Sequence, residues 1–322
     1  MEQLFGWCFI GTGSLANQVA SELQRKGGHK IVSVYSRRFE KAKEFCKKHE
    51  GEAYASAEEA IMAPGVQGVY IVTPHNSHYQ YAKQAIELGK PVLCEKPITT
   101  DANKAKELFA LAKERNVYLV EAMWTWFSPI AYQVKKWIDE GEYGEIESIF
   151  ITYHVDIQRH ARLIDPNLAG GILLDCGIYP ITYLYRLFGK PVKIVCEGMI
   201  RNGVDMKEEI DLSFSNGKTF HASASMMDFK GLERLVIKGS DARTNLRFFH
   251  FADKVKLIRK HGRNSTVRGS TSYKTEFDCV AAEILAGKTE SDYVPPSATI
   301  DVLEIMDECR RQMGLVYPFE KE

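Results

Sequence analysis

The stretch Ile10–Ala16 reads IGTGSLA and follows an apolar run that begins at Leu4. The apolar run predicts a buried strand, and Ala16–Lys26 is typical of an amphipathic helix. Gly11 permits a tight turn between them, Gly13 has no Cβ to obstruct a phosphate, and Ala16 allows close helix–strand packing. The stretch therefore predicts a dinucleotide-binding turn, although an ordinary structural turn has the same pattern. Its candidate cofactor contacts are Gly11, Thr12, Gly13, Ser14 and Leu15.

The first third of the chain alternates short apolar runs with amphipathic segments. The predicted strands are Leu4–Ile10, Ile31–Tyr35, Val69–Val72, Val92–Cys94 and Val117–Val120. The predicted helices are Ala16–Lys26, Phe39–Lys48, Ala57–Met62, Ser77–Leu88 and Asn103–Arg115, with Gly27, Gly89 and Asn116 as stop signals. Strands that alternate with helices indicate a parallel sheet with helices on both faces.

After about residue 122 the pattern changes. It predicts a helix over Ile130–Glu140, a long strand over Glu145–Val155 and a glycine-flanked helical stretch that ends at Phe188. Strands typical of an antiparallel sheet follow at Val192–Met199, Glu209–Phe214, Thr219–Ser225, Leu232–Lys238 and Val255–Arg259, and a last helix lies near Ala298–Met313. We therefore predict two domains, residues 1–121 and an α+β domain over 122–322. The basic segment Arg259–Ser272 is interpreted as a mobile loop, and the alternative is a patch that binds phosphate or nucleic acid.

The bulk composition favours a soluble globular protein with a small partner. Of the 322 residues, 45% are hydrophobic and 26% charged, and the formal net charge is zero, so nothing indicates a nucleic-acid or membrane partner. Seven cysteines, none in a CxxC pair, favour reduced thiols in a cytoplasmic protein. The amino terminus lacks the pattern of a signal peptide, and no unbroken apolar run is long enough to span a bilayer.

The end of the second predicted strand carries positive charge. Domains that bind NAD usually have an acidic residue about 20 positions after the glycine turn. This chain has Tyr35-Ser36-Arg37-Arg38 there. Ser36, Arg37 and Arg38 can bind a phosphate, and Lys41 adds a charge one helical turn on. This favours NADP over NAD, although NAD remains possible and a solvated basic helix start is the alternative.

Two further motifs follow predicted strands, at the edge where open α/β sheets bind ligands. The first is TPHNSH, with Thr73, Pro74, His75 and His78. No carboxylate or cysteine stands near its histidines, so helix capping or a cofactor-ribose contact is favoured and no metal site is predicted. The second is CEKP, where burial is expected to perturb the pKa values of Glu95 and Lys96. The alternative for Lys96 is a surface lysine in a turn.

In the second predicted domain, GGILLDCGIY places Asp175 and Tyr179 four residues apart. On a regular helix that spacing puts both side chains on one face. Such a pair is usually a structural contact, but the glycines before it and Pro180 after it indicate a segment shaped for a site.

Taken together, the GxGxxA turn, TPxxxH, EKP, Glu-Ala-Met-Trp-Thr and GGxLLDxGxY make residues 5 to about 189 resemble the glucose–fructose oxidoreductase/inositol dehydrogenase (Gfo/Idh/MocA) family. Within it the chain is most similar to the dimeric dihydrodiol dehydrogenase and NADP-dependent D-xylose dehydrogenase branch. Two features support this placement. One is Arg37 together with Lys41, and the other is Tyr179, where many relatives have His.

The resemblance implies a Rossmann domain, a doubly wound parallel sheet, followed by an α+β domain with a large open, mostly antiparallel sheet. The exposed face of that sheet commonly forms a dimer interface in the family, and the Lys96–Pro97 peptide can be cis.

The resemblance also implies hydride transfer between NADP and a sugar, inositol or cyclic diol that lies between Lys96 and Tyr179. Tyr179 would donate and accept the proton, Lys96 would lower its pKa, and Asp175 would bind a substrate hydroxyl or orient Lys96. Glu95 and Lys96 would also contact the cofactor.

The chain departs from the branch at one position. The branch usually has Trp-Thr-Arg where this chain has Trp124-Thr125-Trp126, so an indole replaces the expected cation. Trp124 and Trp126 are candidate substrate contacts, and Trp126 would stack on a ring or fill core space.

Two other functions remain open at this point. A nucleotide-sensing regulator would need only the first-domain motifs, and a glycosidase that uses a tightly bound NAD would retain its cofactor through purification. Retention of Lys96, Asp175 and Tyr179 favours the dehydrogenase over the regulator.

Overall fold

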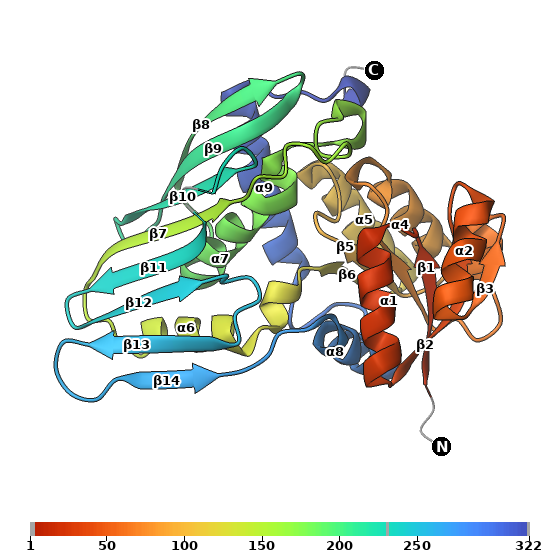
Figure 1. Ribbon diagram of the computed structural model, residues 1–322, viewed down its shortest axis with the longest axis horizontal. Coiled ribbons are helices and arrows are strands. Elements are labelled where there is room, and N and C mark those ends of the chain that lie inside the picture. The colour runs from red at the N-terminus through yellow and green to blue at the C-terminus, as the bar shows by residue number, and fades with distance from the viewer. Residues whose placement is uncertain (1–3, 230–231, 321–322) are drawn as a thin grey trace. The chain divides into compact units, whose positions relative to one another are not determined.

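A computed structural model describes residues 4–229 and 232–320 of the chain (Figure 1). The chain divides into two compact units, of which the first comprises Met1–Trp124 with Ser272–Ile300, and the second Thr125–Thr271 with Asp301–Glu322. The first unit holds a six-stranded parallel sheet, and the second holds an eight-stranded, mostly antiparallel sheet. The predicted α/β fold class is confirmed.

The sheet of the first unit has the strand order β3-β2-β1-β4-β5-β6. Its strands are β1 (Phe5–Ile10), β2 (His29–Tyr35), β3 (Glu52–Tyr54), β4 (Gly68–Ile71), β5 (Val92–Glu95) and β6 (Leu119–Ala122). Every residue of β1, β4, β5 and β6 is buried, as expected for parallel strands with helices on both faces. The order reverses beside β1, so the carboxyl ends of β1 and β4 form the crevice where such sheets bind ligands.

Helices connect these strands. They are α1 (Ser14–Lys26), α2 (Phe39–His49), α3 (Ala57–Ile61), α4 (His78–Glu87, after the 3₁₀ turn η1, His75–Ser77) and α5 (Ala102–Arg115). Asp101 caps α5 by accepting a hydrogen bond from the Lys104 N–H, and Asn116 ends it in the left-handed conformation. All five predicted helices of this region are confirmed, with ends shifted by at most two residues.

The predicted division at residue 121/122 is wrong in one respect, because the chain returns to the first unit near its end. Helix α8 (Tyr273–Leu285) belongs to that unit. Its fully buried Phe277 packs with ring centroids 4.8 Å from Trp7 and 5.0 Å from Tyr70. Aromatic residues of β1 and β4 therefore need this late helix to complete their core.

The sheet of the second unit has the order β14-β13-β12-β11-β7-β10-β9-β8. Only the β7–β10 pair is parallel among the pairs that the structure describes in this sheet. The strands are β7 (Ile146–His154), β8 (Lys193–Arg201), β9 (Val204–Ser213), β10 (Thr219–Ser225), β11 (Glu233–Gly239), β12 (Ala242–Arg247), β13 (Lys254–Arg259) and β14 (Ser265–Arg268).

Sequence patterns missed β3, β12, β14 and α8. In β12 the inward residues are Ala242, Thr244 and Leu246, which do not form an apolar alternation. The segment Arg259–Ser272 was predicted as a loop, but Ser265–Arg268 pairs with β13 as β14. Backbone hydrogen bonds to a neighbour strand hold this polar stretch in place, and such long-range pairing leaves little trace in composition.

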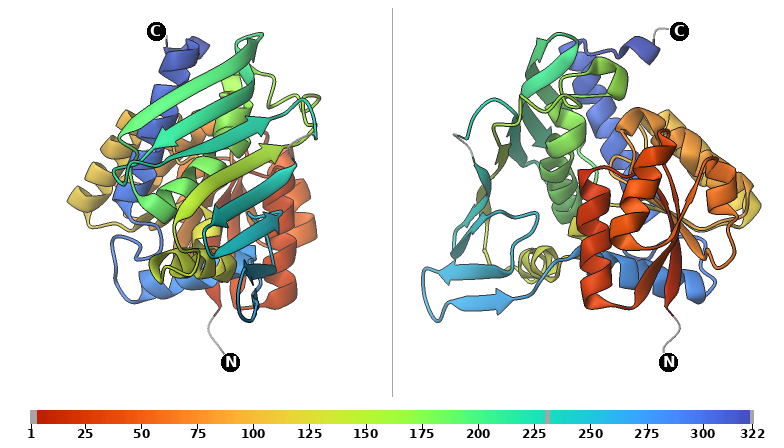
Figure 2. Two further views of the ribbon diagram at one scale, coloured as in Figure 1. Left: turned by 90° about the vertical axis from the view of Figure 1, so that its left-hand side faces the viewer. Right: turned by 45° about the vertical axis from the view of Figure 1, so that its right-hand side comes forward.

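Helices α6 (Pro129–Asp139) and α7 (Ile178–Phe188) cover one face of the second sheet, and the left view of Figure 2 shows them behind it. The unit also contains the 3₁₀ turns η2 (Trp124–Phe127), η3 (Pro166–Leu168) and η5 (Pro318–Glu320), and a π-helical segment, η4 (Leu173–Gly177). The first residue of η2, Trp124, still belongs to the first unit. Helix α9 (Pro296–Met313) continues the chain from the first unit into the second.

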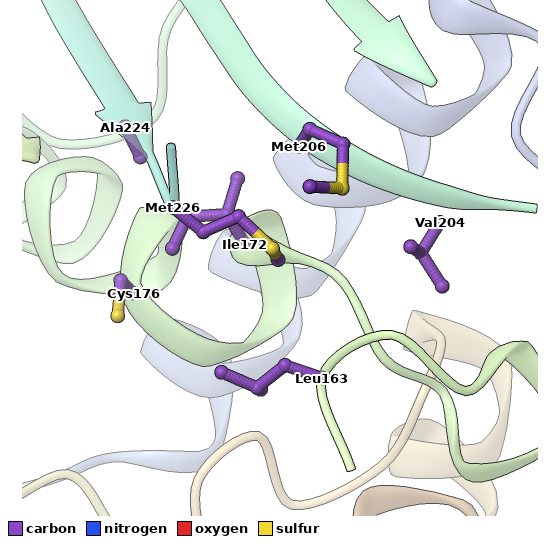
Figure 3. Packing of buried hydrophobic residues seen from close by; sticks show 7 residues of the cluster. All are labelled: Leu163, Ile172, Cys176, Val204, Met206, Ala224 and Met226. Carbon is purple, nitrogen blue, oxygen red and sulfur yellow. The ribbon is translucent and has the colours of Figure 1, made fainter. Parts of the chain in front are cut away.

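One core cluster packs the region around η4 against the second sheet (Figure 3). It consists of Leu163, Ile172, Cys176, Val204, Met206, Ala224 and Met226. The stretch Pro166–Phe188 is apolar and long enough to cross a membrane by composition alone. Because 83% of its most apolar window is buried within the protein, we interpret it as a core segment. All seven cysteines are free thiols.

Candidate functional site

The glycine turn joins β1 to α1. Gly11 has φ +117°, and a Cβ there would lie 2.6 Å from the Val72 carbonyl oxygen, so only glycine fits. Gly13 has φ −71°, and a Cβ on it would meet no atom within 4 Å. Glycine at position 13 thus keeps a space open beside the amino end of α1, whose first-turn N–H groups attract anions. The turn fits a dinucleotide pyrophosphate.

Side chains around the turn fix its shape and leave the space free. The Asn17 amide donates to the Gly13 carbonyl oxygen over 2.8 Å, and no acidic residue stands in the first turn of α1. Ala16 is fully buried against the sheet, as the close helix–strand packing predicted at this position requires. Ser14 is exposed and Thr12 and Leu15 are partly exposed, so the whole turn except Gly11 reaches the surface.

Positive charge gathers at the carboxyl end of β2. Ser36 is half-buried, and Arg37, Arg38 and Lys41 are exposed. None of these three cations is paired with a carboxylate in the described part of the chain. Arg38 stands at the N-cap of α2 without a side-chain cap bond. The charges are therefore free to bind a phosphate group, and the acid between them, Glu40, is paired with Lys43.

The buried side chain of His78 fixes the Thr73–His78 loop. His78 is fully buried, and its two ring nitrogens each lie 2.8 Å from a carbonyl oxygen, one of Pro97 and one of Thr73. The side chain thus joins this loop to the loop after β5, and its contact with the cofactor stays a prediction. His75 is also buried. Within residues 4–229 and 232–320 no group of three His, Cys, Asp or Glu could hold a metal ion.

Lys96 stands just after β5, and the Lys96–Pro97 peptide is cis, which confirms that expectation. Its neighbour Glu95 is buried. The Tyr70 hydroxyl donates to Glu95 Oε1 over 2.6 Å, and the Lys96 N–H donates to Glu95 Oε2 over 3.3 Å. Glu95 therefore fixes the backbone at Lys96, whose own side chain is partly exposed.

A second buried carboxyl supports the same loop from β6. Glu121 accepts the Ile98 N–H over 3.0 Å and the Thr299 hydroxyl over 3.1 Å. Burial raises the pKa of Glu121 to about 7, and the positive charge of Lys96 acts in the opposite direction. Glu276 on α8 is also buried, and its pKa is raised well above the usual range by burial and then by the charges of Glu95 and Glu121. Burial thus favours the neutral form of both Glu121 and Glu276.

In the second unit, Asp175 and Tyr179 lie on different helix types. Asp175 belongs to the π-helical segment η4, and Tyr179 lies in the first turn of α7. The prediction that both lie on one face of a regular helix is therefore not met, because a π-helical turn interrupts the spacing. π-Helical segments are rare and occur often at functional sites.

Each of these two side chains has a defined partner. Arg162 Nη2 donates to Asp175 Oδ1 over 2.8 Å. The Tyr179 ring, 9% exposed, lies 5.8 Å from the Tyr153 ring in a stacked arrangement and 5.2 Å from the His250 ring. His250 is in turn paired with Glu233.

The two tryptophans have distinct surroundings. Trp124 stacks on Tyr273 with ring centroids 5.1 Å apart. The Arg186 guanidinium lies 5.0 Å from the Trp126 ring and donates to the Thr125 and Trp126 carbonyl oxygens. Trp126 and Arg186 line a cavity of about 650 Å³, together with Ile138, Phe188 and Lys218. Asp175 and Tyr179 do not line it.

Sequence reasoning missed Glu121, Arg162, Tyr153 and His250. Glu121 was visible as the first residue of Glu-Ala-Met-Trp-Thr, and its position at the end of an apolar strand was the available signal. Tyr153 and His250 are 97 positions apart along the chain, and only strand pairing brings their rings within 5.2 Å. No spacing rule could have joined them.

Comparisons with known proteins agree with this architecture. Residues 5–122 match the model of the Gfo/Idh/MocA oxidoreductase family with an NAD-binding Rossmann fold. Residues 132–244 match the Gfo/Idh/MocA C-terminal domain.

Two similar proteins are enzymes matched over nearly their whole length. D-xylose 1-dehydrogenase (NADP(+)) of Hypocrea jecorina is 28% identical, with 97% of this chain and 93% of that enzyme covered. Trans-1,2-dihydrobenzene-1,2-diol dehydrogenase of Homo sapiens is 29% identical, with 98% of each chain covered. The crystal structure of KijD10, a 3-ketoreductase from Actinomadura kijaniata in complex with NADP and TDP-benzene, has a TM-score of 0.85 at 23% identity. It covers 97% of this chain and 98% of that one, and it supports the fold.

Proposed function

The chain belongs to the Gfo/Idh/MocA oxidoreductase family, and we propose that it transfers a hydride between NADP and a hydroxyl or carbonyl carbon of a sugar, inositol or cyclic diol. Its similarity to an NADP-dependent D-xylose dehydrogenase and to dihydrodiol dehydrogenases supports this substrate class. The observation that carries the proposal is the turn after β1. Gly13 leaves open space at the amino end of α1, and unpaired cations stand at the end of β2.

Several residues of the first unit would hold NADP. The turn Gly11–Leu15 would bind the pyrophosphate, and Ser36, Arg37, Arg38 and Lys41 would bind the 2′-phosphate. Thr73, Pro74 and His75 follow β4. Glu95 ends β5 and Lys96 follows it, at the edge where such sheets bind their ligands. When bound, NADP supplies or takes up the hydride.

The chain's own residues move the proton and orient the substrate. The Tyr179 hydroxyl gives a proton to the substrate oxygen during reduction and takes it back during oxidation. The Lys96 ammonium stabilises the phenolate that this step leaves. Asp175, held by Arg162, accepts a hydrogen bond from a substrate hydroxyl, and Trp124 and Trp126 contact the substrate's apolar face.

The proposal extends to assembly and location. The sheet face opposite α6 and α7 carries Phe150, Val195 and Met199, which are 48%, 42% and 47% exposed. We propose that this face joins two copies of the chain into a dimer. Seven free thiols fit a reducing compartment such as the cytoplasm.

A fluorescence titration with NADPH and NADH tests the cofactor assignment. The wild-type protein should bind NADPH more tightly than NADH, and addition of aldoses, inositols and cyclic diols should show which one turns over. In Arg37→Ala/Arg38→Ala the loss of NADPH affinity should be about 10- to 100-fold, because each guanidinium–phosphate bond is charge-assisted. NADH affinity should change far less. Equal losses for both nucleotides would contradict the NADP assignment, and the matched control is Arg25→Ala at the other end of α1.

A further inference from the structure

Two acidic side chains of β9 lie inside the second unit, beneath the helical segment that carries Asp175 and Tyr179. Asp205 and Glu208 are both fully buried. Strand geometry alone would place residues three apart on opposite faces. A bulge at Met206 changes this, because Met199 and Ile200 of β8 pair with Lys207 and Asp205, which leaves Met206 without a partner in β8. The bulge thereby turns both acids toward the interior.

Each acid contacts one end of the π-helical segment η4. Asp205 Oδ2 accepts the Leu173 N–H over 2.6 Å, at the first residue of the segment. A Cβ on Gly171 would lie 2.0 Å from Asp205 Oδ1, and a Cβ on Gly177 would lie 2.1 Å from Glu208 Oε1. Gly171, which precedes the segment, and Gly177, its last residue, thus leave the space that the two carboxyl groups occupy.

The two carboxyl groups act on each other's ionisation. Glu208 Oε1 and Oε2 accept no hydrogen bond from any N–H or O–H of the described residues. Two adjacent carboxylates shielded from water cannot both be ionised. Burial, and then the charge of Asp205, raises the pKa of Glu208 well above the usual range, which favours a protonated Glu208 that can donate to Asp205.

Within residues 4–229 and 232–320, the groups with the largest effects on the pKa of Glu208 include no cation. The other titratable groups that act on Glu208 are Cys196 of β8 and Glu209 of β9, both of which oppose its ionisation. Glu208 and Asp205 in turn act on Cys309 of α9 and on Tyr317. This environment therefore favours a protonated Glu208.

Apolar packing also holds the segment. In Figure 3, Ile172 and Cys176 lie in one cluster with Val204 and Met206 of β9. Strand β9 therefore contacts the segment through both apolar and acidic side chains, and the acids reach its two ends.

We propose that Asp205 and Glu208 are positioning residues for the reaction, which hold the π-helical segment in the shape that presents Asp175 and Tyr179 to the substrate. This inference rests on the catalytic roles proposed above for those two residues. Asp205 anchors the segment by the Leu173 N–H, and Glu208 shares its proton with Asp205 and packs against Gly177.

The first test compares two substitutions of Glu208 in the full chain. In Glu208→Gln the side-chain amide replaces the shared proton as donor to Asp205, and kcat should stay within about threefold of wild type. Glu208→Ala removes the donor, and kcat should fall by about 10- to 100-fold, since a misplacement of about 1 Å has effects of that size. NADPH affinity should not change in either variant. The matched control is Glu209→Ala, the next residue of β9, which pairs with Lys207 and His221.

A double-mutant cycle tests the contact with Gly177. Gly177 has φ −60°, so alanine is permitted by the backbone, and the obstacle to it is Glu208 Oε1. Gly177→Ala should lower kcat, and Gly177→Ala/Glu208→Ala should lose less than the product of the two single effects. Strictly multiplicative losses, or a Glu208→Gln variant as impaired as Glu208→Ala, would overturn the proposal.

Two readouts do not depend on turnover. Amide hydrogen exchange of residues 172–178 should accelerate in Glu208→Ala and remain near wild type in Glu208→Gln. The infrared difference spectrum between wild type and Glu208→Gln at neutral pH should contain the band of a protonated carboxyl group. If the wild type oxidises no polyol with NADP while these two results hold, the proposed function fails and the positioning role stands. If the exchange of 172–178 is unchanged or the carboxyl band is missing, the positioning inference fails.

Discussion

Tyr179 is the residue on which the proposed chemistry depends most directly. Its ring is packed by Tyr153 and His250, so a phenylalanine fits the same space and removes only the hydroxyl. We expect Tyr179→Phe to lower kcat by about 10²- to 10⁴-fold, the range of general acid–base contributions. NADPH affinity, measured by fluorescence titration, should remain within about twofold of wild type.

Tyr132→Phe is the control for this substitution, because Tyr132 lies on α6 with its side chain 64% exposed. A Tyr179→Phe variant that keeps most of its turnover would assign the proton to Lys96 or to a water molecule. A parallel loss of NADPH affinity would indicate a structural effect.

Glu121 gives a prediction about pH. Its pKa in the folded protein is raised to about 7, whereas the ordinary value is 4.5. The unfolded chain therefore releases the proton at lower pH than the folded protein does. The contribution of this group to stability is fully present below about pH 4.5 and is lost as the pH rises to about 7, by on the order of 3 kcal/mol.

Glu121→Gln should abolish this pH-dependent loss and keep an acceptor for the Ile98 N–H. Chemical denaturation of the two proteins between pH 4.5 and pH 8 should show their difference in unfolding free energy shift in favour of the variant. Glu58→Gln, on the exposed side of α3, is the control. A difference that is constant with pH would show that Glu121 titrates alike in the folded and unfolded chains.

At the scale of elements, the two glycines of the turn between β1 and α1 have different roles, one in stability and one in cofactor binding. Gly11→Ala places a Cβ 2.6 Å from the Val72 carbonyl oxygen at a φ of +117°, so we expect a loss of stability of about 2 kcal/mol or more. Gly13→Ala meets no protein atom within 4 Å and should fold like the wild type. Its methyl group enters the space proposed for the pyrophosphate, so NADPH should bind about tenfold or more weakly.

Thermal unfolding and NADPH titration of both variants check this pair of effects. The prediction requires them to separate, with stability lost in Gly11→Ala and affinity lost in Gly13→Ala. Undiminished NADPH binding by Gly13→Ala would mean that the cofactor does not approach this turn.

The elements that could be predicted are those whose own residues contain the information. β1 has six consecutive buried residues, and Asn116 ends α5 in the left-handed conformation that asparagine tolerates. The elements that could not be predicted depend on distant partners. β12 alternates Ala242, Thr244 and Leu246 with polar residues, and its neighbours in the sheet decide its conformation.

The candidate site divides in the same way. Lys96, Asp175 and Tyr179 stand in short motifs whose order along the chain resembles that of a family, so they could be named from the sequence. Arg162, His250 and the Asp205–Glu208 pair could not. Their roles depend on an ion pair across 13 residues, a ring contact across 71 and a bulge in β9.

At the scale of the whole molecule, the first unit depends on residues that the chain supplies last. Helix α8 brings Phe277 to the rings of Trp7, Phe9 and Tyr70. Sequence order therefore does not define the units, and residues 1–121 without α8 would expose a large aromatic surface.

The open face of the second sheet yields the last prediction. Phe150 pairs with His221, His221 with Asp211 and Asp211 with Val195, so these four residues form one row across β7, β10, β9 and β8. Adjacent paired residues of a sheet share a face, which is opposite to the one that buries Ile149, Ile151 and Ala222 under the helices. The row therefore brings apolar side chains and charges together on the surface.

If this face joins two copies of the chain, Phe150→Asp should convert the dimer to a monomer in sedimentation velocity experiments at micromolar concentration. A buried carboxylate without a partner at the centre of the interface would cost several kcal/mol in each copy. Met62→Asp is the matched control, because Met62 is 50% exposed in the first unit and should leave the assembly unchanged. A wild-type protein that sediments as a monomer at all concentrations would refute the interface. If Phe150→Asp still sediments as a dimer, the interface lies on another surface, because a charge on this face would then not have disturbed assembly.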